Sequence, residues 1–72
     1  MNQSFEIIIG SPVNYDELVA YIVVDGKEVA LLSQDRGKEK LEIVFAEENV
    51  LRRVNFDLFT IALSEAKRRL LR

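Results

Sequence analysis

The sequence predicts an α+β fold, an antiparallel four- or five-stranded β-meander with one C-terminal α-helix packed on one face. Two turn signals and one helical pattern lead to this prediction. Asp25-Gly26 and Asp35-Arg36-Gly37 each separate apolar runs, as hairpin turns do. Residues 56–71 repeat apolar side chains with the period of a helix. These elements favour two layers around one core.

Four strands are expected before the helix. The first ends at Gly10-Ser11-Pro12, because proline has no amide hydrogen to donate and restricts the residue before it. A loop is expected over residues 11–17. Apolar runs on both sides of the two turns supply the later strands. In order, the strands are expected at about residues 5–9, 18–24, 27–33 and 39–45.

The two turns also predict how the strands pair. Asp25 and Gly26 at the centre of a type I′ turn place Ile22 opposite Val29. A three-residue loop with Gly37 in the left-handed conformation places Val29 opposite Ile43. The two registers agree, and alternation of side chains then assigns each residue to a face. The face expected beneath the helix carries Phe5, Ile7, Ile9, Leu18, Ala20, Ile22, Val24, Val29, Leu31, Leu41, Ile43 and Phe45.

The helix is expected at about residues 56–71. Asn55 is a favoured N-cap residue, and Val54 with Phe59 has the spacing of a hydrophobic staple. Residues 50–54 form either a short fifth edge strand or an irregular linker. The stripe expected to face the sheet consists of Phe56, Phe59, Ala62, Leu63, Ala66 and Leu70, with Leu58, Ile61 and Leu71 outside it.

Length and composition exclude several classes of protein. The 72 residues are expected to form one domain, residues 1–72, and they include no cysteine and no histidine. Disulfides, zinc sites of the usual type and Ser-His or Cys-His catalytic pairs are therefore excluded. The start lacks the features of a signal peptide, and no apolar run approaches the roughly 20 residues of a membrane span. A cytoplasmic protein without a membrane partner is expected.

The face of the sheet opposite the helix, here called the open face, is the candidate functional surface. Soluble monomers seldom expose apolar patches beyond a few hundred Å². A homodimer could pair two such faces, a different protein could bind there, or the C-terminal tail or the loop 10–17 could cover the face. The apolar residues expected on it are Ile8, Val19, Tyr21, Val23, Ala30, Leu32 and Val44.

Two groups of charged residues provide further candidates. The net charge of −2 divides into −6 over residues 1–51 and +4 over residues 52–72. Glu28 and Glu42 could act as an acid–base pair on the open face, or pair with cations across strands. No catalytic residue, cofactor or metal site is assigned. The basic C-terminal region could contact nucleic-acid phosphates, and its arginines are Arg52, Arg53, Arg68, Arg69 and Arg72.

Part of the sequence resembles the layout of small uncharacterised bacterial proteins, cyanobacterial ones among them. The residues that carry this resemblance are 30–37, 41–45, Phe59, Ala62, Ala66 and Lys67. The resemblance covers about residues 17–70. Some small proteins of this build act as immunity proteins or antitoxins, so the resemblance implies that the chain acts by binding a partner. The expected function is a non-enzymatic protein–protein interaction module, with a second copy or another protein as its partner. Nucleic-acid binding through the basic region is the alternative.

Overall fold

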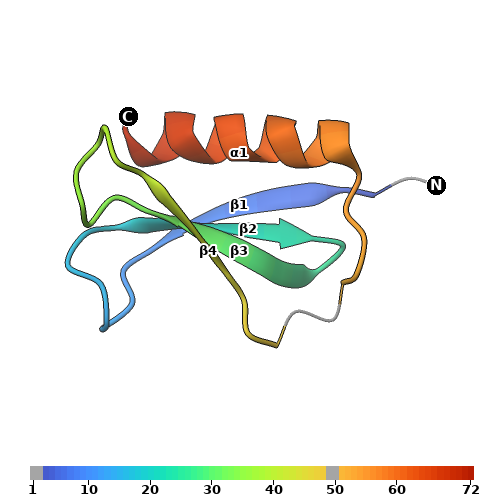
Figure 1. The fold of residues 1–72 in the computed structure, drawn as a ribbon, viewed down its shortest axis with the longest axis horizontal. Helices are drawn as coiled ribbons and strands as arrows, with labels where there is room; N and C mark the ends of the chain where they lie inside the picture. The colour runs from blue at the N-terminus through green and yellow to red at the C-terminus, as the bar shows by residue number, and fades with distance from the viewer. Residues whose placement is uncertain (1–2, 49–50) are drawn as a thin grey trace.

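The computed structural model describes residues 3–48 and 51–72, which form one antiparallel sheet with a helix on one face (Figure 1). The strand order β1-β2-β3-β4 confirms the predicted meander and the α+β class. Of the candidate fifth strand, residues 51–54 are irregular, and Val50 lies outside the described residues. The elements are β1 (Phe5–Gly10), β2 (Val19–Val24), β3 (Lys27–Ser33), β4 (Glu42–Phe45) and α1 (Phe56–Leu70).

The turn between β2 and β3 forms as predicted. Asp25 and Gly26 have φ values of 51° and 81°, the positive values that a type I′ turn requires, and Val24 pairs with Lys27. The Asp25 carboxylate also accepts a hydrogen bond from the amide of Ser4 at 3.0 Å. The turn therefore holds the start of β1 as well as joining two strands.

A β-bulge in β3 changes which of its residues face α1. The expected pair of Ile22 with Val29 does not form, because Val29 is an extra residue in β3 and Ile22 pairs with Ala30. Each later residue of β3 therefore lies on the face opposite to the expected one. Ala30 and Leu32 lie in the core, 0% and 5% exposed, so their assignment to the open face is wrong. Leu31 lies on the open face instead of beneath the helix.

The loop between β3 and β4 is longer than the sequence predicts. Gly37 has the expected positive φ of 108°, and its amide donates to the carbonyl three residues earlier at 2.9 Å. A second turn follows directly, in which the amide of Lys40 donates to the carbonyl of Gly37 at 3.1 Å. This turn uses residues expected to be strand, so β4 is shorter than the predicted range 39–45. Ile43 consequently pairs with Leu32.

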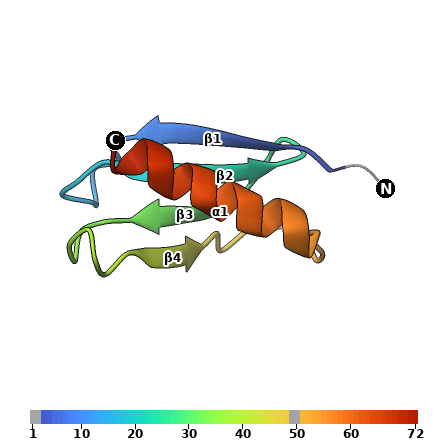
Figure 2. The ribbon, with the colours of Figure 1, turned by 90° about the horizontal axis from the view of Figure 1, so that it is seen from above.

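α1 begins as predicted, at an Asn55 N-cap whose Oδ1 accepts from the amide of Leu58 at 3.0 Å. Its stripe differs from the expected one at both ends. Phe56 is 77% exposed, and the N-terminal end of α1, where it lies, extends past the end of β4 (Figure 2). Leu58 and Leu71 pack against the core instead of lying outside the stripe. The residues of α1 in or against the core are Leu58, Phe59, Ala62, Leu63, Ala66 and Leu70.

Candidate interaction surface

β4 is the strand that α1 leaves uncovered. Among the described elements, α1 packs on β1, β2 and β3 but not on β4, which lies beside the helix in Figure 2. A helix is about 10 Å wide and strands are about 4.8 Å apart, so one helix covers two or three strands. Ile43 and Phe45 lie on the α1 side of the sheet, yet 42% and 61% of their surfaces are exposed. Their expected burial in the core is wrong, and the width of a single helix was the signal that could have revealed it.

The exposed part of β4 is apolar on both faces of the sheet. Val44, on the open face, is 39% exposed. On the other face an open hollow of about 270 Å³ lies between α1 and β4. We call Ile43, Val44 and Phe45 the β4 surface. The hollow beside it is lined by Leu32, Leu41, Ile43, Leu63, Ser64 and Lys67.

The outer edge of β4 presents backbone groups as well as side chains. The amide of Ala46 donates to the carbonyl of Val29 at 3.0 Å, so Ala46 and, by alternation, Val44 face β3. The N–H and C=O groups of Ile43 and Phe45 therefore point away from the sheet. No hydrogen bond from the described part of the chain reaches that outer side. An edge strand whose outward N–H and C=O groups have no partner can pair with a further strand.

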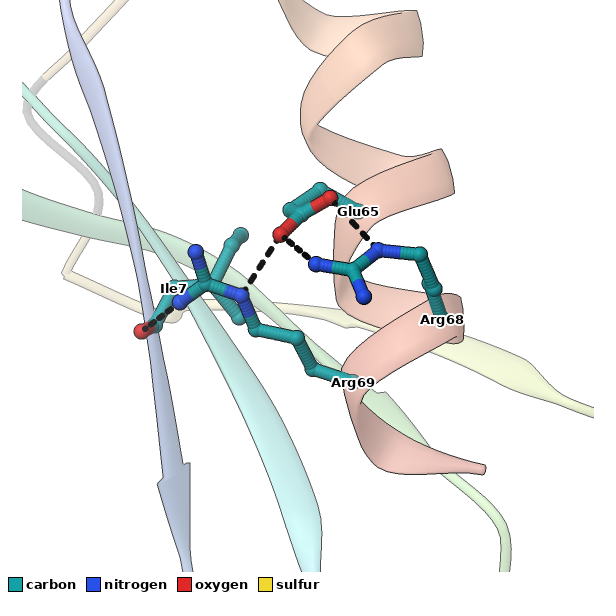
Figure 3. Close-up of polar contacts among 4 residues, drawn as sticks. All are labelled: Ile7, Glu65, Arg68 and Arg69. Carbon is teal, nitrogen blue, oxygen red and sulfur yellow. Dashed lines mark hydrogen bonds and ion pairs between the residues drawn. The ribbon is translucent and has the colours of Figure 1, made fainter. Parts of the chain in front are cut away.

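The opposite edge of the sheet, at β1, carries a charged side chain. The carbonyl of Ser4 accepts from the amide of Asp25 at 3.0 Å, so by alternation the carbonyl of Ile7 points away from β2. Nη1 of Arg69 donates to this carbonyl at 3.4 Å, and Glu65 orients Arg69 by accepting from its Nε at 2.6 Å (Figure 3). A charged group at a strand edge hinders the addition of a further strand. The two edges of this sheet are thus protected differently.

Glu65 binds Arg68 as well as Arg69. Arg68 donates to the two carboxylate oxygens from Nε at 3.0 Å and from Nη2 at 2.6 Å. Hydrogen bonds from Arg68 and then from Arg69 lower the pKa of Glu65 from 4.5 to about 2. The hydrogen bond with Glu65 in turn raises the pKa of Arg68. Two arginines of the basic region are therefore engaged with a carboxylate of their own helix.

The loop between β1 and β2 lies on the open-face side of the sheet, below it in Figure 1. Two hydrogen bonds tie this loop to the loop between β3 and β4. The carboxylate of Asp35 accepts from the amides of Asp16 at 3.1 Å and Glu17 at 2.9 Å. Val19 and Leu31 are only 0% and 8% exposed although α1 packs on the opposite face. Part of the open face is therefore already covered by this chain.

The seven residues expected on the open face differ in which face they occupy and in how far they are buried. Five of them lie there, and the other two are the β3 residues that the bulge moves into the core. Ile8 and Val44 are 46% and 39% exposed, at the two outer strands. Tyr21 and Val23 are half-buried, and Val19 is buried. The exposed apolar residues of this face are therefore separated by its covered centre.

α1 separates the arginines of the basic region. Arg52 and Arg53 precede the helix, whereas Arg68, Arg69 and Arg72 lie at or beyond its last turn. α1 has 15 residues. At a rise of about 1.5 Å per residue, the two groups are roughly 20 Å apart. The structure does not gather these arginines into one cluster.

The candidate acid–base pair is separated too. Glu28 lies near the start of β3, opposite Val23, whereas Glu42 pairs with Ser33 at the end of β3. Positions five residues apart along a strand are separated by about 16 Å. Glu42 also forms an exposed ion pair with Arg36 at 3.3 Å. The two carboxylates cannot act together on one reacting atom.

Residues 3–48 and 51–72 contain no group of three or more acidic side chains arranged to hold a metal ion. Over the same residues, no helix has the length and apolar content that a bilayer crossing requires. Comparison with known proteins gives no matching family model, no matching curated protein and no matching solved structure. Function is therefore argued from the chemistry of the surfaces described above.

Proposed function

We propose that this chain is a small non-enzymatic protein-interaction module that binds its partner along β4. The observation that carries the proposal is the state of the β4 edge. Ile43 and Phe45 present backbone groups with no partner in the described chain, together with side chains 42% and 61% exposed. An added strand would use both features, because backbone hydrogen bonds supply affinity and the exposed side chains supply selectivity. The hollow beside α1 offers room for an apolar side chain of the partner.

The contrast between the two edges supports β4 as the binding edge. Soluble proteins protect edge strands with lysine, proline, bulges or inward charges. At β1, Arg69 occupies an outward carbonyl, whereas the sequence of β4, Glu-Ile-Val-Phe, has a single charge at its start. That charge, on Glu42, is paired with Arg36. The open face is a weaker candidate, because Val19 and Leu31 on its two inner strands are already buried.

The substitution Phe45→Lys tests the proposal. A cationic side chain at this edge position discourages strand addition while leaving the bonds between β3 and β4 in place. Immobilised parent chain is expected to retain a protein from the host extract, and Phe45→Lys to retain it at least about tenfold less, as for a central interface residue.

Ile61→Lys is the matched control for this experiment. Ile61 is 58% exposed on α1 and receives the same chemical change away from β4. The control is expected to capture the same protein as the parent. Circular dichroism of all three chains shows whether each is folded. Equal capture by folded Phe45→Lys would contradict the assignment of β4 as the binding edge.

A further inference from the structure

We infer that the strand added to β4 is β4 of a second copy of this chain, paired antiparallel about a two-fold axis at Val44. This inference rests on the proposed function and names the partner of the same edge. Each copy would contribute four strands to one continuous sheet. The backbone, the charges beside the strand and the position of α1 each support it.

The first support is the match of backbone groups. With the axis at Val44, Ile43 of one copy lies opposite Phe45 of the other, and the reverse pair is equivalent. Residues with outward N–H and C=O groups then face each other in both pairs, so all of these groups on the four-residue strand find partners. If the axis lay at Ile43 or at Phe45, that residue would pair with its counterpart in the second copy. The other of the two would then lie opposite a residue outside β4.

The second support is charge complementarity at the ends of the strand. Lys40 precedes Val44 by four residues, and Glu48 follows it by four. Both lie in the turns that flank β4, so antiparallel pairing about Val44 brings the Lys40 turn of each copy beside the Glu48 turn of the other. Both side chains are exposed in the single chain. The two-fold axis repeats the opposite-charge pair at both ends of the interface.

The third support is the space that α1 leaves. A two-fold axis perpendicular to the sheet places both helices on the same face, one over each set of β1, β2 and β3. The β4 strands then meet in the uncovered middle, where Ile43 and Phe45 form aromatic and β-branched cross-strand pairs. Such pairs are among the favourable ones in antiparallel sheets. The sheet can therefore extend without moving either helix.

Sedimentation of the parent chain from about 1 µM to 1 mM tests the inference. The interface is small, so dissociation in the micromolar range or weaker is expected. The mass should rise with concentration towards twice the 8.3 kDa of one chain. Phe45→Pro should remain monomeric throughout, since it removes one outward amide, while Ile61→Lys should behave as the parent.

A charge exchange tests the register and does not require proline to be tolerated. Lys40→Glu is expected to weaken the dimer by roughly tenfold, because it makes both end pairs repulsive. Adding Glu48→Lys should restore the parent affinity. A dimer unaffected by Lys40→Glu, or not restored by the double exchange, would overturn the register proposed here.

The outcomes separate this inference from the proposed function. A parent chain that stays monomeric at 1 mM, yet still captures a host protein in a Phe45-dependent manner, overturns the second copy as partner and leaves the β4 edge as the binding site. A dimer that forms equally well with Phe45→Lys overturns this inference, because its contacts would then lie elsewhere. Equal capture of a host protein by the same variant would overturn the proposed function as well.

Discussion

At Gly10 the missing side chain makes room for an aromatic ring on the open face. A Cβ atom at this position would lie 2.8 Å from Cε2 of Tyr21, well inside the usual separation of non-bonded carbon atoms. Glycine within a strand weakens it, so its presence is expected where another group approaches the backbone closely. The ring of Tyr21 is that group, and it is half-buried there.

Gly10→Ala is therefore expected to have opposite effects in two backgrounds. In the parent chain it should lower the free energy of unfolding by about 1 kcal/mol, because the methyl group displaces the ring. In a Tyr21→Ala background it should raise that free energy by about 0.5 kcal/mol, because alanine suits a strand better than glycine. Urea unfolding of the four chains measures both effects. The same sign in both backgrounds would contradict the close contact.

At the scale of the element, β3 shows why alternation alone misassigned a face. Residues 29–32 are Val-Ala-Leu-Leu, four apolar side chains in succession. A period of two carries no information in such a run, because either face reads as apolar. The bulge at Val29 lets both Val29 and Ala30 join the core, and Leu32 follows them. Packing against α1 therefore selected the register of β3.

A pair of identical substitutions distinguishes the observed burial from the burial that the sequence predicts. Leu32→Ala is expected to lower the free energy of unfolding by about 2–5 kcal/mol, because Leu32 is 5% exposed in the core. Leu18→Ala should cost about 1 kcal/mol or less, because Leu18 is 48% exposed. The faces expected from the sequence, with Leu18 beneath the helix and Leu32 on the open face, predict the reverse order. Thermal or urea unfolding of the two variants measures the difference.

At the scale of the whole molecule, one helix on a four-stranded sheet produces two unlike edges. The C-terminal end of α1 reaches β1, where Arg69 contacts the carbonyl of Ile7, and β4 stays beyond the helix (Figures 2 and 3). Glu65 binds Arg69 and so links the last turns of α1 to the edge of the sheet. Loss of the hydrogen bonds of Glu65 is therefore expected to lower the free energy of unfolding of the whole chain.

Acid titration of unfolding tests that role of Glu65. Folding lowers the pKa of Glu65 from 4.5 to about 2, so its ionised form stabilises the folded chain above about pH 4.5. This contribution is lost as the pH falls from 4.5 towards 2. The free energy of unfolding of Glu65→Gln should lie below that of the parent near neutral pH, and the two should converge over this range. Arg68→Ala, which removes the largest cause of the shift, should show a smaller pH-dependent loss than the parent.

A good part of the fold follows from local chemistry. Asp25-Gly26 requires a tight turn of one type, and Asn55 before an apolar stripe requires a helix start, so hairpin, helix and meander order were predictable. Neither signal depends on distant residues. The same is true of the exclusions that follow from lacking cysteine and histidine.

Which surface remains free was decided by packing. The bulge at Val29, the second turn at Lys40 and the position of α1 over three strands depend on how distant side chains fit together. Together they buried Leu32 and exposed Phe45, the reverse of what alternation predicts. Side-chain periodicity places a residue on a face, but only the layer above that face determines whether the residue meets protein or water.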